Sequence, residues 1–240
     1  MINMRQLFTF LFIAISTVSC GQVFSKKDNG NIQTENRKVE AYTQVANIGS
    51  LDVILTEGTM GEIRVEASDN ILEYILTTVQ NGELTIKLDP KYNYALKHKA
   101  MVYVPINSDL RKILQSGSGD IEMKHQLEVD KLECELVGSG DVKINVKANQ
   151  LSLKIVGSGD IETKGSAIQL QTEVIGAGDV MAKKLIATNA KAIVNGSGDT
   201  VIFVTEKVEA SILGAGDIII SGNPKTRDTK VLGVGDIRYK

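Results

Sequence analysis

A pattern of glycine, one variable residue, glycine and aspartate recurs seven times in the second half of this 240-residue chain. The copies occupy residues 117–120, 138–141, 157–160, 176–179, 196–199, 214–217 and 233–236. Successive aspartates are 18 to 21 residues apart. A turn signal that returns with a period near 20, without an apolar pattern of helical length, is typical of a β-solenoid. The sequence therefore predicts an all-β fold, a parallel β-solenoid of about seven coils over residues 115–240.

Two sets of alternating apolar residues lie between consecutive patterns. Ile144 and Val146 follow one aspartate, and Leu151, Leu153 and Ile155 precede the next glycine. Alternation with period two indicates half-buried strands, so each coil should supply at least two. Stacked coils would pair in parallel at about 4.8 Å, which aligns equivalent side chains in columns.

The glycines and aspartates are expected to form one column of sharp corners. Positive φ angles, or backbone packed against backbone, would exclude a Cβ atom at the glycines. The aspartates are expected to accept hydrogen bonds from turn N–H groups, and bound calcium is the alternative that would offset repulsion between stacked carboxylates. These candidate site residues are Asp120, Asp141, Asp160, Asp179, Asp199, Asp217 and Asp236.

Residues 39–114 are rich in strand signals but lack the repeated pattern. Residues 84–88 alternate after the hairpin dipeptide Asn81-Gly82, and residues 102–104 form a further strand that stops at Pro105. Since an uncovered terminal coil exposes its core and its strand edge, this region is expected to be a β-layer that caps the solenoid.

The first residues have the layout of a secretory signal. Arg5 precedes a short uncharged apolar run over residues 7–15, and small or polar residues lead to Ser19 and Cys20. Residues 1–19 are therefore predicted to be a signal peptide and Cys20 a lipidated cysteine, with ordinary signal cleavage nearby as the alternative. Residues 20–38 are polar and are expected to be a flexible tether. Cys134 alternates with leucines and is interpreted as a buried small apolar residue.

The composition argues against a nucleic-acid partner. Lysine and arginine total 27 against 29 aspartates and glutamates, so there is no basic excess. Tryptophan is absent and glycine numerous, which favours a thin core of aliphatic residues over a thick globular one.

Together, the secretion signal, the strands at residues 84–88 and 102–105 and the run of Gly-Ser-Gly-Asp corners resemble the putative auto-transporter adhesin, head GIN domain family. The likeness covers roughly residues 39–240. It implies a β-solenoid-like protein of the bacterial envelope, common among Bacteroidota, and it brings no catalytic residues with it.

Three functional classes follow from this sequence. The first is a noncatalytic binding or adhesion module, held to the membrane by its lipid, with a surface glycan or protein as ligand. The second is a structural or assembly element of the envelope, for which a homo-oligomer is an open alternative. The third is a carbohydrate-active enzyme, which is disfavoured because the acidic residues repeat identically and the only histidines are His98 and His125. We therefore expect an adhesion module without a cofactor, lipid-anchored in the cell envelope at the outer membrane.

Overall fold

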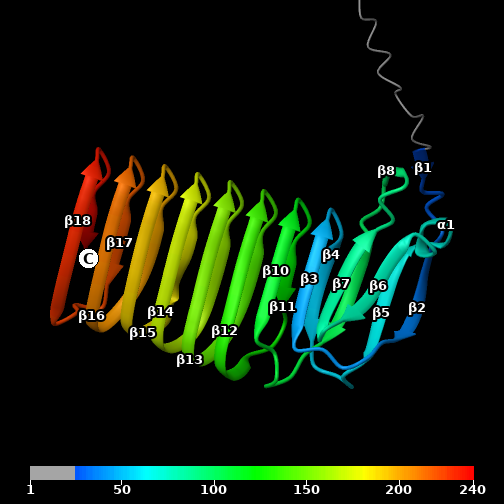
Figure 1. The fold of residues 1–240 in the computed structure, drawn as a ribbon, viewed down its shortest axis with the longest axis horizontal. Coiled ribbons are helices and arrows are strands. Elements are labelled where there is room, and N and C mark those ends of the chain that lie inside the picture. Colours follow the sequence, from blue (N-terminus) through cyan, green and yellow to red (C-terminus); the bar gives the residue numbers. More distant parts are fainter. Residues whose placement is uncertain (1–24) are drawn as a thin grey trace, which may run out of the picture.

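The computed structural model describes residues 25–240, and nearly all of them belong to strands. The repeats form a parallel β-solenoid, which confirms the predicted fold (Figure 1). Four long strands wrap around bends to form most of a coil each: β13 (Val142–Gly157), β14 (Ile161–Gly176), β15 (Val180–Gly196) and β16 (Thr200–Gly214). The coils before and after them are divided into β10 (Lys112–Gly117), β11 (Ile121–Met123), β12 (Leu127–Gly138), β17 (Ile218–Ser221), β18 (Thr226–Gly233) and β19 (Ile237–Tyr239).

Parallel pairing in register lines up equivalent side chains along the solenoid axis. In one column Leu136, Ile155, Val174, Val194 and Ile212 follow each other, and each is at most 1% exposed. The side chains between them face outward, as the alternation along each strand requires. The core is therefore a thin stack of aliphatic residues, as expected from the composition.

Differences in repeat length are absorbed in the first half of each coil. The repeat from Asp120 to Asp141 is 21 residues long, and its two extra residues lie around His125, between β11 and β12. The repeat from Asp179 to Asp199 is 20 residues long, and its extra residue in β15 shifts the pairing with β14 between Glu162 and Lys164. The second halves, such as residues 150–157 and 169–176, stay aligned throughout. Surface columns on these second halves therefore run straight along the molecule.

The solenoid begins one coil earlier than the repeat pattern indicates. Strands β3 (Gln44–Gly49) and β4 (Asp52–Thr56) pair in parallel with β10 and β11, and Gly49 aligns with Gly117. Gly49, Ser50, Leu51 and Asp52 form an eighth corner in which Leu51 replaces the second glycine. The region expected to be only a cap thus contributes a coil of its own.

The remaining N-terminal strands cover this first coil. Strands β7 (Glu83–Leu88) and β9 (Met101–Pro105) add in parallel to β3 and β4. Beyond them, β6 (Ile75–Gln80) runs antiparallel to β7, β5 (Glu62–Ser68) antiparallel to β9, and β2 (Ile32–Lys38) antiparallel to β5. The four-residue helix α1 (Asp69–Leu72) follows β5. This mixed sheet is the expected cap, and it lies at the opposite end from β18 (Figure 1).

The predicted tether is corrected for residues 25–38, because the structure places most of them in strands. All seven residues of β2 pair with β5, and Arg37 donates hydrogen bonds to the carbonyls of Leu72 and Ile75. Such a polar edge strand buries little and is held by backbone pairing, so no apolar pattern marks it. The predicted signal peptide and Cys20 lie outside the described residues.

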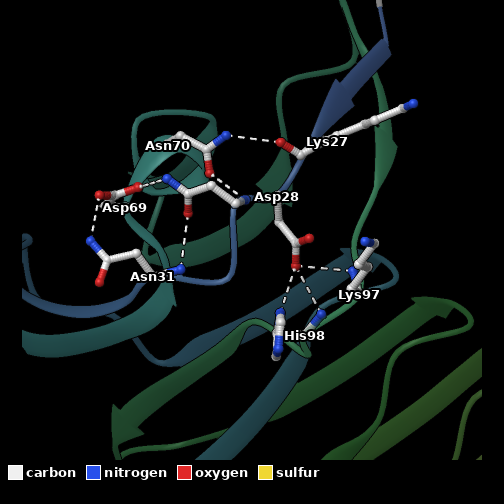
Figure 2. Close-up of polar contacts among 8 residues, drawn as sticks. Lys27, Asp28, Asn31, Asp69, Asn70, Lys97 and His98 are labelled. Carbon is white, nitrogen blue, oxygen red and sulfur yellow. Dashed lines mark hydrogen bonds and ion pairs between the residues drawn. The ribbon is translucent and has the colours of Figure 1, made fainter.

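A small second sheet precedes β2. Strand β1 (Ser25–Lys27) pairs in parallel with β8 (Asn93–Ala95). Asp28 then accepts hydrogen bonds from the backbone N–H groups of Lys97 and His98, and lies 3.2 Å from Nδ1 of the His98 ring (Figure 2). Among residues 25–240, no helix has the length and apolar character needed to cross a bilayer.

Candidate functional site

The seven predicted aspartates do lie in one column, together with Asp52. Each Asp backbone N–H donates to Oδ1 of the aspartate one coil earlier, at 2.7 to 3.3 Å, from Asp120 on Asp52 to Asp236 on Asp217. One carboxylate oxygen is thus held by the turn N–H group of the next corner, as predicted from the sequence.

The rest of the corner is satisfied by backbone groups. The carbonyl of Gly117 accepts from the N–H groups of Ser139 and Gly140, at 3.0 and 3.2 Å. The N–H of Val142 donates to the carbonyl of Asp160 at 2.9 Å, and the same contacts recur along the column. Since buried backbone groups must be paired, this network explains why the corner repeats without change.

Cations lie against the two ends of the aspartate column. Lys99 contacts Asp52 at 2.8 Å and Asp120 at 3.8 Å, and Arg238 contacts Asp217 at 2.8 Å and Asp236 at 3.2 Å. The hydrogen bond to Asp52 raises the pKa of Lys99. Carboxylates along the middle of the column face solvent, where water and salt screen their repulsion.

The column does not have the arrangement of a usual metal or acid–base site. Among residues 25–240, no three His, Cys, Asp or Glu side chains come together as a metal ion would require. The aspartates along the middle of the column, Asp141, Asp160, Asp179 and Asp199, each accept from the next corner in the same way, whereas acid–base catalysis needs groups in different environments. Calcium binding by the column stays a prediction.

The histidines and Cys134 lie away from any shared site. The His98 ring is half exposed and contacts Asp28, whereas His125 lies in the turn between β11 and β12. Cys134 is 1% exposed, and burial raises the pKa of its thiol to about 12. It is confirmed as a buried apolar residue, and its thiol stays protonated at neutral pH.

A groove of about 650 Å³ runs along the outer face of the aligned second halves of the coils. Its floor carries amide and hydroxyl side chains from successive coils: Gln150, Ser152, Gln169, Gln171 and Asn189. Gln150 aligns with Gln169 and then with Asn189, and Ser152 aligns with Gln171, so the groups repeat at the coil spacing. We call these five residues the amide ladder.

Lys–Glu pairs frame this groove at both ends. Lys131 contacts Glu133 at 2.8 Å, and Lys207 contacts Glu209 at 2.6 Å. The hydrogen bond from Lys131 lowers the pKa of Glu133, and that from Lys207 lowers the pKa of Glu209. The framing charges therefore neutralise each other.

The amides between these pairs are free to bind a ligand. Within residues 25–240, the structure shows no hydrogen bond from another protein group to the side chains of the amide ladder. Each carboxamide offers two donors and an acceptor with two lone pairs. The groove thus presents repeating hydrogen-bond groups along an extended line, with Lys191, aligned with Gln171, as a cation within it.

A second hollow, of about 760 Å³, lies around the neighbouring bend of the coils. It combines exposed Ile168 and Ile186 with charged residues such as Arg111 and Glu128. It lacks the regular column of one chemical type that marks the amide groove.

Sequence reasoning missed the amide ladder because the corners dominated the repeat. A signal was present: counted from the preceding aspartate, Gln150 and Gln169 both stand nine residues on, and Asn189 stands ten. Aligning whole repeats, rather than their corners, would have shown an amide column.

A known protein family covers most of the chain. The family model described as "Putative auto-transporter adhesin, head GIN domain" matches residues 41–224. The chain belongs to this family. No curated protein is similar enough to the chain to match it.

Solved structures share the architecture of this chain. A putative adhesin from Bacteroides fragilis is 25% identical, with a TM-score of 0.81 over 90% of this chain and 100% of its own. A putative lipid binding protein from Parabacteroides distasonis is 23% identical, with a TM-score of 0.74 over 90% of this chain and 99% of its own. A putative adhesin from Parabacteroides merdae is 22% identical, with a TM-score of 0.72 over 91% of this chain and 100% of its own. The last two show the fold alone, and the family description suggests an adhesion-like role at the cell surface.

Proposed function

We propose that this head GIN protein is a noncatalytic adhesion module of the bacterial envelope that holds an extended glycan along the amide groove. The observation that carries the proposal is the amide ladder, whose side chains have no hydrogen-bond partner among residues 25–240 and repeat along the groove beside Lys191. Sugar hydroxyls both donate and accept hydrogen bonds, so a neutral, extended glycan matches this chemistry. Contacts spread over several coils would each contribute modestly, and affinity would come from their number.

The proposed anchor is a lipid on Cys20 in the outer membrane. The apolar run that ends at Ser19-Cys20 supports it. Strand β1 lies at the far end from β18 (Figure 1), so a chain held at its N-terminus would direct the repeats away from the membrane. Mass spectrometry of the native N-terminus tests this step: an acylated Cys20 is expected, and an unmodified chain that begins elsewhere would refute the anchor.

Glycan binding is tested by probing an array of neutral and acidic bacterial polysaccharides with the full chain. Each of Gln150→Ala, Gln169→Ala and Gln171→Ala should weaken binding by roughly twofold to tenfold, the value of one hydrogen bond. The triple variant should lose most binding. Asn149→Ala is the matched control, because Asn149 is the neighbour of Gln150 but is hydrogen-bonded to Asp130 outside the groove.

Two outcomes would contradict the proposal. The first is a triple variant that binds as the native chain does, or a native chain that binds no polysaccharide. The second is release of shorter products from a polysaccharide by the purified chain, with loss of that turnover in Asp141→Asn, Asp160→Asn or Asp179→Asn while the fold survives. That result would replace adhesion with catalysis.

A further inference from the structure

The last coil of the solenoid leaves the outer edges of β18 and β19 open. Strand β18 pairs with β16 on one side, and no strand among residues 25–240 pairs with its other side. All eight of its residues are exposed. The other end of the solenoid is covered by the antiparallel strands β2, β5 and β6, so the two ends differ (Figure 1). An open edge of this kind is a ready template for pairing with another chain.

Apolar side chains gather at this end. Val231 continues the core column of Val194 and Ile212, but it is 40% exposed, whereas they are 0% and 1% exposed. Leu232, Val234 and Tyr239 are 53%, 85% and 37% exposed. Exposed apolar residues that cluster beside an unpaired edge are typical of an interaction surface.

The charges on β18 are complementary to a second copy of β18. The strand contains Arg227, Asp228, Thr229, Lys230 and Val231 in succession. If two copies run antiparallel with Thr229 facing Thr229, Asp228 of each copy lies opposite Lys230 of the other. Opposite charges that face each other across antiparallel strands stabilise the pair, and like charges destabilise it. A parallel pairing in register would instead place each charge against itself.

Arg227 already has contacts that lower the cost of covering it. Its guanidinium stacks on the Tyr239 ring at 4.2 Å and donates hydrogen bonds to Oδ1 of Asn223 and the carbonyl of Pro224. Two of the five guanidinium donors are thus already bound, and the ring contact stabilises the charge, which lowers the cost of covering it.

We propose that two copies of this chain associate end to end through β18, paired antiparallel about a two-fold axis at Thr229. The pairing extends the sheet across the interface and covers Val231 and Tyr239. Because the same edge is used by both copies, the assembly closes as a dimer and leaves no β18 edge for further growth. The N-terminal ends of the two copies then lie at the two far ends of the dimer.

Cysteine cross-linking of the purified full chain tests the proposal. Facing residues of antiparallel strands have Cα atoms about 4.5 to 5.5 Å apart, which lies within the reach of a disulfide. Thr229→Cys is therefore expected to give a disulfide-linked dimer on a non-reducing gel. Ser158→Cys, on an exposed corner far from β18, is the control for random collision and should give little. Equal cross-linking at the two sites would overturn the proposal.

Charge exchange tests the register. In the Thr229→Cys chain, Asp228→Lys alone or Lys230→Asp alone should reduce cross-linking at least several-fold, because each places like charges opposite each other twice. The double variant Asp228→Lys, Lys230→Asp restores opposite charges and should restore the dimer. A double variant that cross-links no better than the singles would refute this pairing, and rescue excludes misfolding as the cause. Neither result depends on glycan binding.

Discussion

At the scale of single residues, the two glycines of a corner are required for different reasons. The first has positive φ, such as 124° at Gly117, and a Cβ there would lie 2.4 Å from the carbonyl oxygen of Gly49. The second has no unusual φ, but a Cβ at Gly159 would lie 2.0 Å from the carbonyl oxygen of Gly140. The first glycine is thus constrained by both conformation and space, and the second by space alone.

Gly49 separates these two effects, because it has a φ of 113° but no atom within 4 Å of the Cβ position. Gly49→Ala should lower the free energy of unfolding by about 1 kcal/mol, the value of a strained φ. Gly117→Ala adds the steric clash and should lower it by about 3 kcal/mol or more. Denaturant unfolding of both variants is the measurement, and equal losses would show that the corners are not in close contact.

The corner aspartate is expected to matter less than the glycine. Asp160→Ala removes the acceptor for the Asp179 N–H, which is bound at 2.9 Å, and should lower the free energy of unfolding by about 1 kcal/mol. Asp160→Asn keeps an oxygen acceptor and removes repulsion along the column, so its loss should be smaller, most clearly at low salt. If Asn and Ala destabilise equally, the acceptor is not what the corner needs.

A buried threonine interrupts one core column. Thr172 is 0% exposed, lies between Leu153 and Ala192, and its hydroxyl has no hydrogen-bond partner among the described residues. Thr172→Val keeps the shape and removes the unpaired group, so it should raise the free energy of unfolding by about 1 kcal/mol. Thr34→Val on exposed β2 is the control and should change little. A destabilised Thr172→Val would indicate that the hydroxyl has an ordered partner in solution.

The seven corners could be predicted from the sequence because their glycines and aspartates never vary. The eighth could not, because Leu51 stands where glycine is otherwise required. The structure explains the exception: no earlier corner lies below Leu51, so its side chain has room and is buried at 1% exposure. The second glycine is therefore required only where a corner packs directly on an earlier corner.

At the scale of elements, β1 and β2 show the limit of periodicity as a signal. Only Ile32 in β2 is a large apolar residue, and it is 40% exposed. Hydrogen bonds between polar side chains hold this segment instead: Asn29 and Asn31 both donate to Asp69, and Figure 2 shows the contact of Asn31. Because the partners of β1 and β2 are distant in the sequence, no local alternation of apolar residues marks these strands.

The Asp28 contact should make the β1–β8 segment sensitive to acid. Hydrogen bonds from the backbone of His98, from its ring and from the backbone of Lys97 hold the pKa of Asp28 below its ordinary value of 3.8. A lowered pKa means that this stabilisation is complete above pH 3.8 and is lost as the pH falls through the lower folded value. The Lys97 and His98 amide shifts, followed by NMR, should titrate with a midpoint below 3.8.

Asp28→Asn is the control for this titration. The variant should remove the transition from both amides and leave the corner amides unchanged. A midpoint above 3.8 in the native chain would contradict the proposed role of these hydrogen bonds.

At the scale of the whole molecule, the solenoid and its cap could be predicted, but the groove depended on the register. Repeat lengths of 18 to 21 residues leave the alignment of surface positions open until the structure shows that the first halves absorb the differences. The amide ladder becomes a straight column only with that alignment. Similarly, the complementary charges of β18 matter only because the strand lies at an edge.

Because each coil contacts only its neighbours, equal substitutions should have unequal effects along the axis. Val194 and Val231 occupy the same core column, but Val194 is 0% exposed in the middle and Val231 is 40% exposed in the last coil. Val194→Ala should lower the free energy of unfolding by about 2 kcal/mol, since it removes buried methyl groups and leaves a cavity. Val231→Ala should lower it by less than about 1 kcal/mol, because solvent already reaches the site and the end can relax.

Both substitutions are to be compared in the Lys230→Asp background, so that association through β18 does not bury Val231. Denaturant unfolding gives the two losses, and hydrogen exchange shows where each acts. Val194→Ala should reduce protection in the central coils, and Val231→Ala only in β18 and β19. If Val231→Ala weakens protection equally along the whole solenoid, the coils unfold as one unit, and the nearest-neighbour description of this molecule is wrong.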